Sequence, residues 1–167
     1  KAMAAVGTAY TLMTFLTSIL IGLCMGSGSV FSFYYGKRDL VKMQRCMRTA
    51  FWIVGGIAAA VEALAFILAD PILVLLKIPE EILEQMHLYV LIIFAGIFFI
   101  FLYDHFAYLL RALGNSVVPL YFLGGTSILN VALDLLFVVG FHWGIGGAAA
   151  ATVFSQMLSG VGIGVYT

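Results

Sequence analysis

Two polar residues, Asn130 and Asp134, stand four positions apart inside the apolar stretch 126–141, TSILNVALDLLFVVGF. At about 3.6 residues per helical turn, this spacing places the amide and the carboxylate on one face of a helix. A charged Asp near the centre of a bilayer costs on the order of 3 kcal/mol. We therefore expect this face to look into a protein interior or a wet cavity, where a cation or a proton offsets the cost.

Three carboxylates in all fall within apolar segments, namely Glu62, Asp104 and Asp134. Each is a candidate functional group, because ionisable residues inside a membrane are costly to place there. Glu62 stands among alanines with no polar neighbour, so a neutral glutamic acid bonded to another helix is an equal alternative. Asp104 has Tyr108 one turn away on its face, whereas Asp134 has Asn130 and is the stronger candidate.

The residue types around Asp134 suit the binding of a small cation. Carboxylate, amide and hydroxyl oxygens together are what sodium needs, and a desolvated carboxylate alone can carry a proton. Thr152, in the last apolar segment, can supply the hydroxyl, with a bond to its own helix as an equal alternative. Tyr89 is a candidate for lining a substrate vestibule.

The histidines and cysteines do not form a metal site by their spacing. The three histidines are scattered, and neither cysteine belongs to a CxxC pair or lies close to a paired histidine. We therefore expect no metal beyond sodium at the same site, no redox chemistry and no cofactor.

The elements that must position these residues are membrane helices. Hydrophobic residues make up 63% of the chain and charged residues 10%, which is outside the range of soluble domains. A formal net charge of zero argues against a nucleic-acid partner, which needs a clustered basic surface. A spanning helix takes about 20 mostly apolar residues. By this measure five spans are predicted, over 2–33, 49–69, 85–110, 117–139 and 144–166.

The charges between the spans predict the orientation of the chain. The stretch 36–48 holds five cations against the single Asp39, so the positive-inside rule predicts a cytoplasmic loop. The next connection is acidic, as expected for the opposite side. A basic amphipathic helix on the membrane surface is an alternative for this stretch. The five cations are Lys37, Arg38, Lys42, Arg45 and Arg48.

Prolines and glycines mark helix ends and helix contacts. Asp70-Pro71 predicts the end of the second span, and Pro79 followed by acidic residues predicts the start of a helix. Small residues four positions apart allow two helix backbones to approach closely in a bilayer. Three such pairs are Gly22 with Gly26, Gly140 with Gly144, and Gly160 with Gly164.

Five stretches of the sequence together resemble the multidrug and toxic compound extrusion (MATE) transporters, in the order and spacing of that family. The resemblance implies an all-α, polytopic helix bundle at the inner (plasma) membrane, with twelve helices in two lobes. The chain 1–167 would then be the second to sixth helices of the six-helix N-terminal lobe, without the first helix and the C-terminal lobe. The stretches are GLCMGSGSVFSFYYGKRDLVKM at 22–43, IPEEILEQMHLYV at 78–90, LLRALGNSVVPL at 109–120, SILNVALDLLFV at 127–138 and WGIGGAAAATVFSQ at 143–156.

The same resemblance implies an antiporter that exports cationic or amphipathic small organic molecules in exchange for sodium ions or protons. It places the family's first-lobe cation site on Asn130, Asp134 and Thr152, and the family's fourth-helix tyrosine on Tyr89. Asp104 stands where the family has Asn, which adds a second carboxylate and leaves the coupling ion open.

Two other functions and a non-functional alternative also have to be considered. A lipid-linked oligosaccharide flippase of the same superfamily shares the architecture, although not usually the paired LRALG and LNxxLD motifs. An intramembrane aspartyl protease would use Asp104 and Asp134, but Gly-x-Gly is absent before Asp134. We therefore expect a transporter and not an enzyme. The isolated chain is expected to be inactive, because alternating access needs two bodies that move against each other.

Overall fold

The structure is a computed structural model that describes residues 2–75 and 80–167. Over these ranges the chain forms helices and no strands, and five helical segments are long and apolar enough to cross a membrane. The prediction of an all-α bundle with five membrane-spanning helices is thus confirmed. The elements are α1 (Ala2–Gly36), α2 (Leu40–Leu75), α3 (Glu80–Ala95), α4 (Ile97–Ala112), α5 (Val117–Asp134), the π-helix η1 (Leu135–Gly140) and α6 (Gly144–Tyr166).

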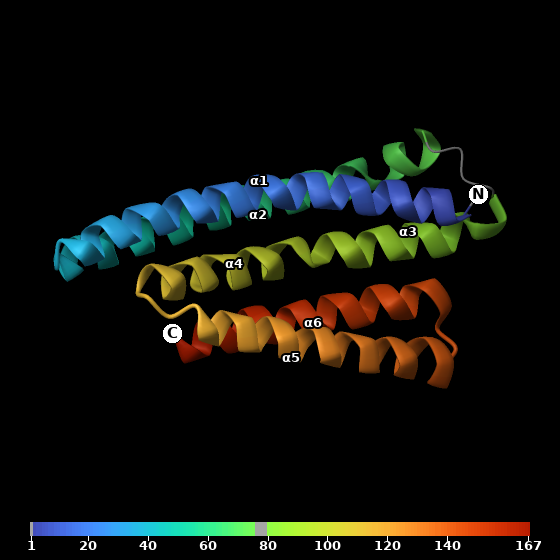
Figure 1. Cartoon of the computed structure of the whole chain (residues 1–167). Coiled ribbons are helices and arrows are strands. Elements are labelled where there is room, and N and C mark those ends of the chain that lie inside the picture. The colour runs from blue at the N-terminus through green and yellow to red at the C-terminus, as the bar shows by residue number, and fades with distance from the viewer. Residues whose placement is uncertain (1, 76–79) are drawn as a thin grey trace.

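The helices form three layers (Figure 1). α1 and α2 lie side by side in one outer layer, and α5 and α6 form the other. α3 and α4 run in line between them, and α4 contacts α1 on one side and α6 on the other. The predicted third span is therefore two helices, because the chain is interrupted at Gly96, whose N–H donates to the Ile93 carbonyl oxygen at 3.0 Å.

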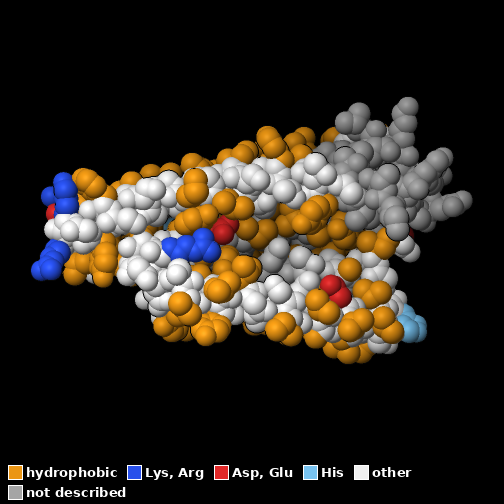
Figure 2. All heavy atoms as spheres, in the orientation of Figure 1, with side chains coloured by type: hydrophobic (Ala, Val, Ile, Leu, Met, Phe, Trp, Pro, Cys, Tyr) orange, Lys and Arg blue, Asp and Glu red, His pale blue; other side chains and the backbone are white. Residues whose placement is uncertain are grey.

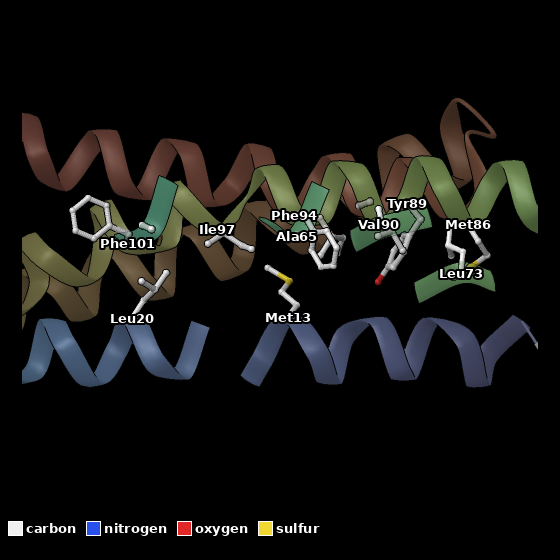
Figure 3. Close-up of a cluster of buried hydrophobic side chains, with 14 of the residues drawn as sticks. Met13, Leu20, Ala65, Leu73, Met86, Tyr89, Val90, Phe94, Ile97 and Phe101 are labelled. Carbon is white, nitrogen blue, oxygen red and sulfur yellow. The ribbon is translucent and has the colours of Figure 1, made fainter. Parts of the chain in front are cut away.

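The apolar core lies between α1, α2, α3 and α4 (Figure 3). Leu20, Ile97 and Phe101 are completely buried there. The outer surface is also largely apolar (Figure 2), with Trp52 and Ile128 each at least 75% exposed. Since lipid tails are as apolar as these side chains, close packing and not the hydrophobic effect has to hold such helices together.

The basic stretch 36–48, predicted as a loop with a basic helix as the alternative, is mostly helical, in agreement with the alternative. α1 ends at Gly36 and α2 begins at Leu40. The carboxylate of Asp39 accepts a hydrogen bond from the Lys42 backbone N–H at 3.1 Å and lies 3.0 Å from Lys42 Nζ. The hydrogen bond from the Lys42 side chain also holds the pKa of Asp39 below its usual range. Hydropathy alone does not show that the start of α2 is helical, because a helix with charged side chains can continue beyond the hydrocarbon layer.

The two helix boundaries predicted from prolines differ from the structure in one case and cannot be compared with it in the other. α2 does not end at Asp70, since the helix continues through Pro71 to Leu75. A proline removes one backbone hydrogen bond and need not stop a helix whose neighbours hold it in place. Pro79 lies outside the described residues, and α3 begins at Glu80.

Close helix contact through glycine is confirmed for Gly160 and Gly164 on α6. A Cβ atom at Gly160 would lie 2.7 Å from the Phe99 carbonyl oxygen, and one at Gly164 would lie 2.9 Å from the Phe106 ring. Both contacts join α6 to α4. At the other two pairs a Cβ atom would approach at most one neighbour. At Gly140 it would lie 3.6 Å from a leucine of its own helix. The prediction of helix packing finds no support for those pairs within the described residues.

We predict that Gly160→Ala destabilises the full-length protein by about 1–3 kcal/mol, the usual cost of overpacking. The new Cβ would collide with the α4 backbone, which cannot rotate away as a side chain can. Gly22→Ala is the matched control, because Gly22 is exposed and a Cβ there meets nothing within 4 Å. Thermal unfolding in detergent measures both variants. Equal unfolding midpoints for the two variants would show that α4 and α6 leave room for a Cβ atom at Gly160, which would contradict the prediction.

Candidate functional site

Asn130 and Thr152 are brought together by the packing of α5 against α6. The Asn130 side-chain amide donates to the Thr152 hydroxyl oxygen at 3.5 Å, a long hydrogen bond. The Thr152 hydroxyl in turn donates to the Ala148 carbonyl oxygen at 3.0 Å, so it also bonds to its own helix. The predicted bond of Thr152 to its own helix is thus present, and the hydroxyl accepts from Asn130 at the same time, because a hydroxyl has one donor hydrogen and two acceptor lone pairs.

Asp134 is the last residue of α5, one helical turn beyond Asn130. It is half-buried, and its Oδ1 atom is inaccessible and has no hydrogen-bond partner. Within the described residues no Lys or Arg pairs with this carboxylate. The chain then continues as a π-helix over Leu135–Gly140, a rare form that is frequent at functional sites. An unpaired, partly buried carboxylate beside an amide and a hydroxyl is a suitable arrangement for holding a proton or a sodium ion.

A cavity of about 350 Å³ lies between α4, α5 and α6, next to this group. Asn130 and Thr152 form part of its wall, while Asp134 lies one turn beyond it. The wall is uncharged and combines hydroxyl and amide groups with the rings of Phe99 and Tyr103. The remaining lining residues are Ile100, Leu123, Thr126, Ser127, Val131, Ser155, Gln156 and Ser159.

Polar contacts across the cavity join the three helices. The Tyr103 hydroxyl donates to the Pro119 carbonyl oxygen at 2.9 Å, which links α4 to the start of α5. The Thr126 hydroxyl lies 3.4 Å from the Ser159 hydroxyl, which links α5 to α6. Gln156 Oε1 is inaccessible and has no hydrogen-bond partner among the described residues, and it packs closely against Gly96, where a Cβ atom would lie 2.5 Å from it.

Two of the predicted site residues lie away from the cavity. Tyr89 is 7% exposed and packs in the apolar core among residues of α1 to α4 (Figure 3). Asp104 is half-buried, and its Oδ2 atom has no partner among the described residues. Arg111 lies about two turns further along the same helix. The structure therefore joins Asn130 and Thr152, places Asp134 beside them, and leaves Asp104 and Tyr89 elsewhere.

Glu62 lies close to the start of another helix. It is half-buried on α2, and its carboxyl group faces the backbone of Phe98 in the first turn of α4. The first turn of a helix exposes N–H groups without helical partners, and these favour a carboxylate. This contact supports the bonded alternative for Glu62.

Sequence reasoning missed most of the cavity wall. The signal was nonetheless present in the last span, where Thr152, Ser155, Gln156 and Ser159 follow one another at intervals that share a helix face. Of these four residues only Thr152 was predicted as a site residue. A search for polar stripes would have found the other three.

The chain is similar to known transport proteins in sequence. The family model MatE matches residues 1–136. The chain is 34% identical over 156 residues to the probable multidrug resistance protein YpnP of Bacillus subtilis (strain 168), covering 93% of this chain and 35% of that protein. It is 31% identical over 171 residues to the probable multidrug resistance protein YoeA of the same organism, covering 99% and 36%.

Solved structures agree with the sequence matches. An outward-facing multidrug resistance MATE family transporter of the MOP superfamily superposes with a TM-score of 0.90 at 22% identity, over 99% of this chain and 37% of that one. The Vibrio cholerae MATE transporter VcmN in its bent form gives a TM-score of 0.84 at 27% identity, over 98% and 37%. The chain thus spans little more than a third of the length of the proteins it matches. The family match over most of its residues, together with the shared fold, shows that the chain belongs to the MatE family.

Proposed function

We propose that this chain forms part of an antiporter that exports cationic or amphipathic organic compounds in exchange for sodium ions or protons. Membership of the MatE family and the names of two multidrug resistance relatives support export of organic compounds. The single observation that carries the coupling is the Asp134 carboxylate, unpaired among the described residues, one helical turn from Asn130, whose amide contacts Thr152 in the wall of an uncharged cavity.

The ion and the cargo would use adjacent parts of one site. Asp134 supplies the charge, while the Asn130 and Thr152 side chains supply neutral oxygens for a cation, or hold a protonated carboxyl in place. The cavity offers aromatic faces and hydrogen-bonding groups to a cargo molecule. A cation stacks favourably on aromatic rings.

Coupling follows if ion and cargo favour different arrangements of these helices. An ion shifts a conformational equilibrium only as far as it binds one conformation better than the other. Binding at Asp134 neutralises a charge at the junction of α5, η1 and α6, which changes the cost of keeping that carboxyl buried. We infer that this change repacks α5 and α6 and expels cargo from the cavity between them and α4. The inner (plasma) membrane, with the start of α2 on the cytoplasmic side, is the proposed setting.

The structure gives no support to the enzyme and flippase alternatives. An aspartyl protease needs two aspartates in contact, whereas Asp104 lies beside Cys24 of α1 and Asp134 lies at the end of α5. Nothing in the cavity wall points to an oligosaccharide carried on a lipid. We therefore propose transport without covalent chemistry, and no cofactor other than the coupling ion.

We predict that Asp134→Asn in the full-length protein abolishes gradient-driven efflux, because the amide keeps the shape but carries no exchangeable charge. Proteoliposomes loaded with a fluorescent organic cation such as ethidium measure the loss when a sodium or proton gradient is imposed. Glu84→Gln is the control, since Glu84 is an exposed carboxylate on α3. Unchanged efflux in the Asp134 variant would remove this residue from the mechanism.

We predict that Thr152→Val weakens binding of the coupling ion about fivefold and leaves the maximal efflux rate close to normal. Valine retains the shape but removes one ligand oxygen and the acceptor of the Asn130 amide, a loss of about 1 kcal/mol. The measurement is the ion concentration that gives half-maximal efflux. Thr17→Val is the control, because the Thr17 hydroxyl makes the same kind of bond to its own helix on α1, at 2.9 Å. Equal effects of the two changes would contradict a role for Thr152 in ion binding.

We propose that Asp104 is a second ion-binding carboxylate, and predict that Asp104→Asn lowers the number of ions exchanged per cargo molecule. Its unpartnered Oδ2 atom and its position away from the cavity support a separate binding event. The ratio follows from the membrane potential at which net cargo flux reverses. An unchanged ratio would show that Asp104 only balances the charge of Arg111.

A further inference from the structure

The structure contains a second recess, largely apolar with one cation at its edge, between α4 and a helix that does not line the cavity. It has a volume of about 210 Å³ and lies between α2 and α4. We propose that this recess binds the phosphodiester headgroup of an anionic membrane lipid. Its lining residues are Met47, Arg48, Phe51, Trp52, His105 and Phe106.

Charge is the first observation that supports an anionic occupant. Lys42, Arg45 and Arg48 lie on one exposed face of α2, at intervals of three residues. Lys42 is paired with Asp39, whereas Arg45 and Arg48 have no anionic partner within residues 2–75 and 80–167. Cations gather where α1 ends and α2 begins, and a further cation lies beside an acidic group nearer the middle of the same face (Figure 2). Arg48 is the member of this set that reaches the recess, and its guanidinium can bind a phosphate with two parallel hydrogen bonds.

The second observation is the order of side chains along α2. Phe51 and Trp52 follow Arg48 by about one helical turn, which places them some 5 Å deeper along the helix. Trp52 is 77% exposed, and tryptophan is the residue most suited to the boundary between headgroups and hydrocarbon. This order, cation first and aromatic ring next, matches the order of phosphate and acyl chain in a lipid.

The third observation is His105, which lines the recess one turn deeper than Arg48. It is 1% exposed and lies among four phenylalanine rings, and its Nδ1 atom has no hydrogen-bond partner among the described residues. A buried polar atom without a partner is unusual and costly. Because this atom is inaccessible, a lipid does not reach it; the ring closes the deep end of the recess, and a headgroup meets Arg48 and the exposed Trp52 instead.

A lipid fits this recess better than a soluble anion does. The residues beside it on α2 are large and apolar, including Trp52 and Ile53, which is 58% exposed. An acyl chain continuing from the headgroup would cover this face, whereas a free phosphate ester would leave it bare. The recess is separate from the cavity that contains Asn130, so lipid binding and ion coupling can be tested independently.

The experiment is native mass spectrometry of the delipidated full-length protein in detergent, titrated with phosphatidylglycerol or with phosphatidylcholine of the same acyl chains. We expect tight binding of at least one phosphatidylglycerol and weaker binding of phosphatidylcholine. Arg48→Gln should raise the dissociation constant for phosphatidylglycerol about fivefold, the effect of one interfacial cation. Arg48 is exposed, so its replacement leaves the core intact.

Lys37→Gln is the matched control, because it removes one positive charge from the same end of the molecule without touching the recess. Lys37 lies over the Phe33 ring at 4.1 Å from its centroid and does not line the recess. We expect it to change the dissociation constant less than twofold. Equal losses in both variants would reduce the effect to general surface charge and overturn the proposal. Equal affinity for the two lipids, or full competition by glycerol 1-phosphate, would also overturn it.

Discussion

The cost of a carboxyl group inside a hydrocarbon layer is the constraint on which the arrangement of this bundle depends. A helix that carries Asp134 cannot present that face to lipid, so α5 has to pack with α6 and place the carboxyl beside other polar groups. The polar side chains accordingly gather between α4, α5 and α6, while the core between α1 and α4 is almost entirely apolar. α4 belongs to both regions and is the wall that divides them.

α6 meets two requirements at once through two adjacent faces. Gly160 and Gly164 let its backbone approach α4 closely. Thr152, Ser155 and Ser159 lie on the neighbouring face and line the cavity. The close contact holds α6 in a fixed position against the central layer, and the polar face then has a defined distance from α5. A residue larger than glycine at Gly160 or Gly164 would therefore displace the polar side chains of the neighbouring face without contacting them.

The sequence predicts the membrane helices well, because long apolar runs are a strong and local signal. It also predicts the Asn130–Thr152 contact, through the resemblance to a known family. It does not predict the interruption at Gly96 or the π-helix after Asp134, since both occur inside apolar runs that read as continuous helix. The helical start of α2 was predicted only as an alternative, because charged residues lower hydropathy without breaking a helix. The burial of Tyr89 depends on how α1 to α4 pack, which no local pattern contains.

The central claim is that a cation held at Asp134 leaves when an organic cation enters the neighbouring cavity. Its most direct test is to add such a compound to the full-length protein in weakly buffered detergent solution, with a proton electrode and a sodium electrode in place. The account predicts release of about one ion, proton or sodium, for each molecule bound. Binding of the compound with no release of either ion would contradict it.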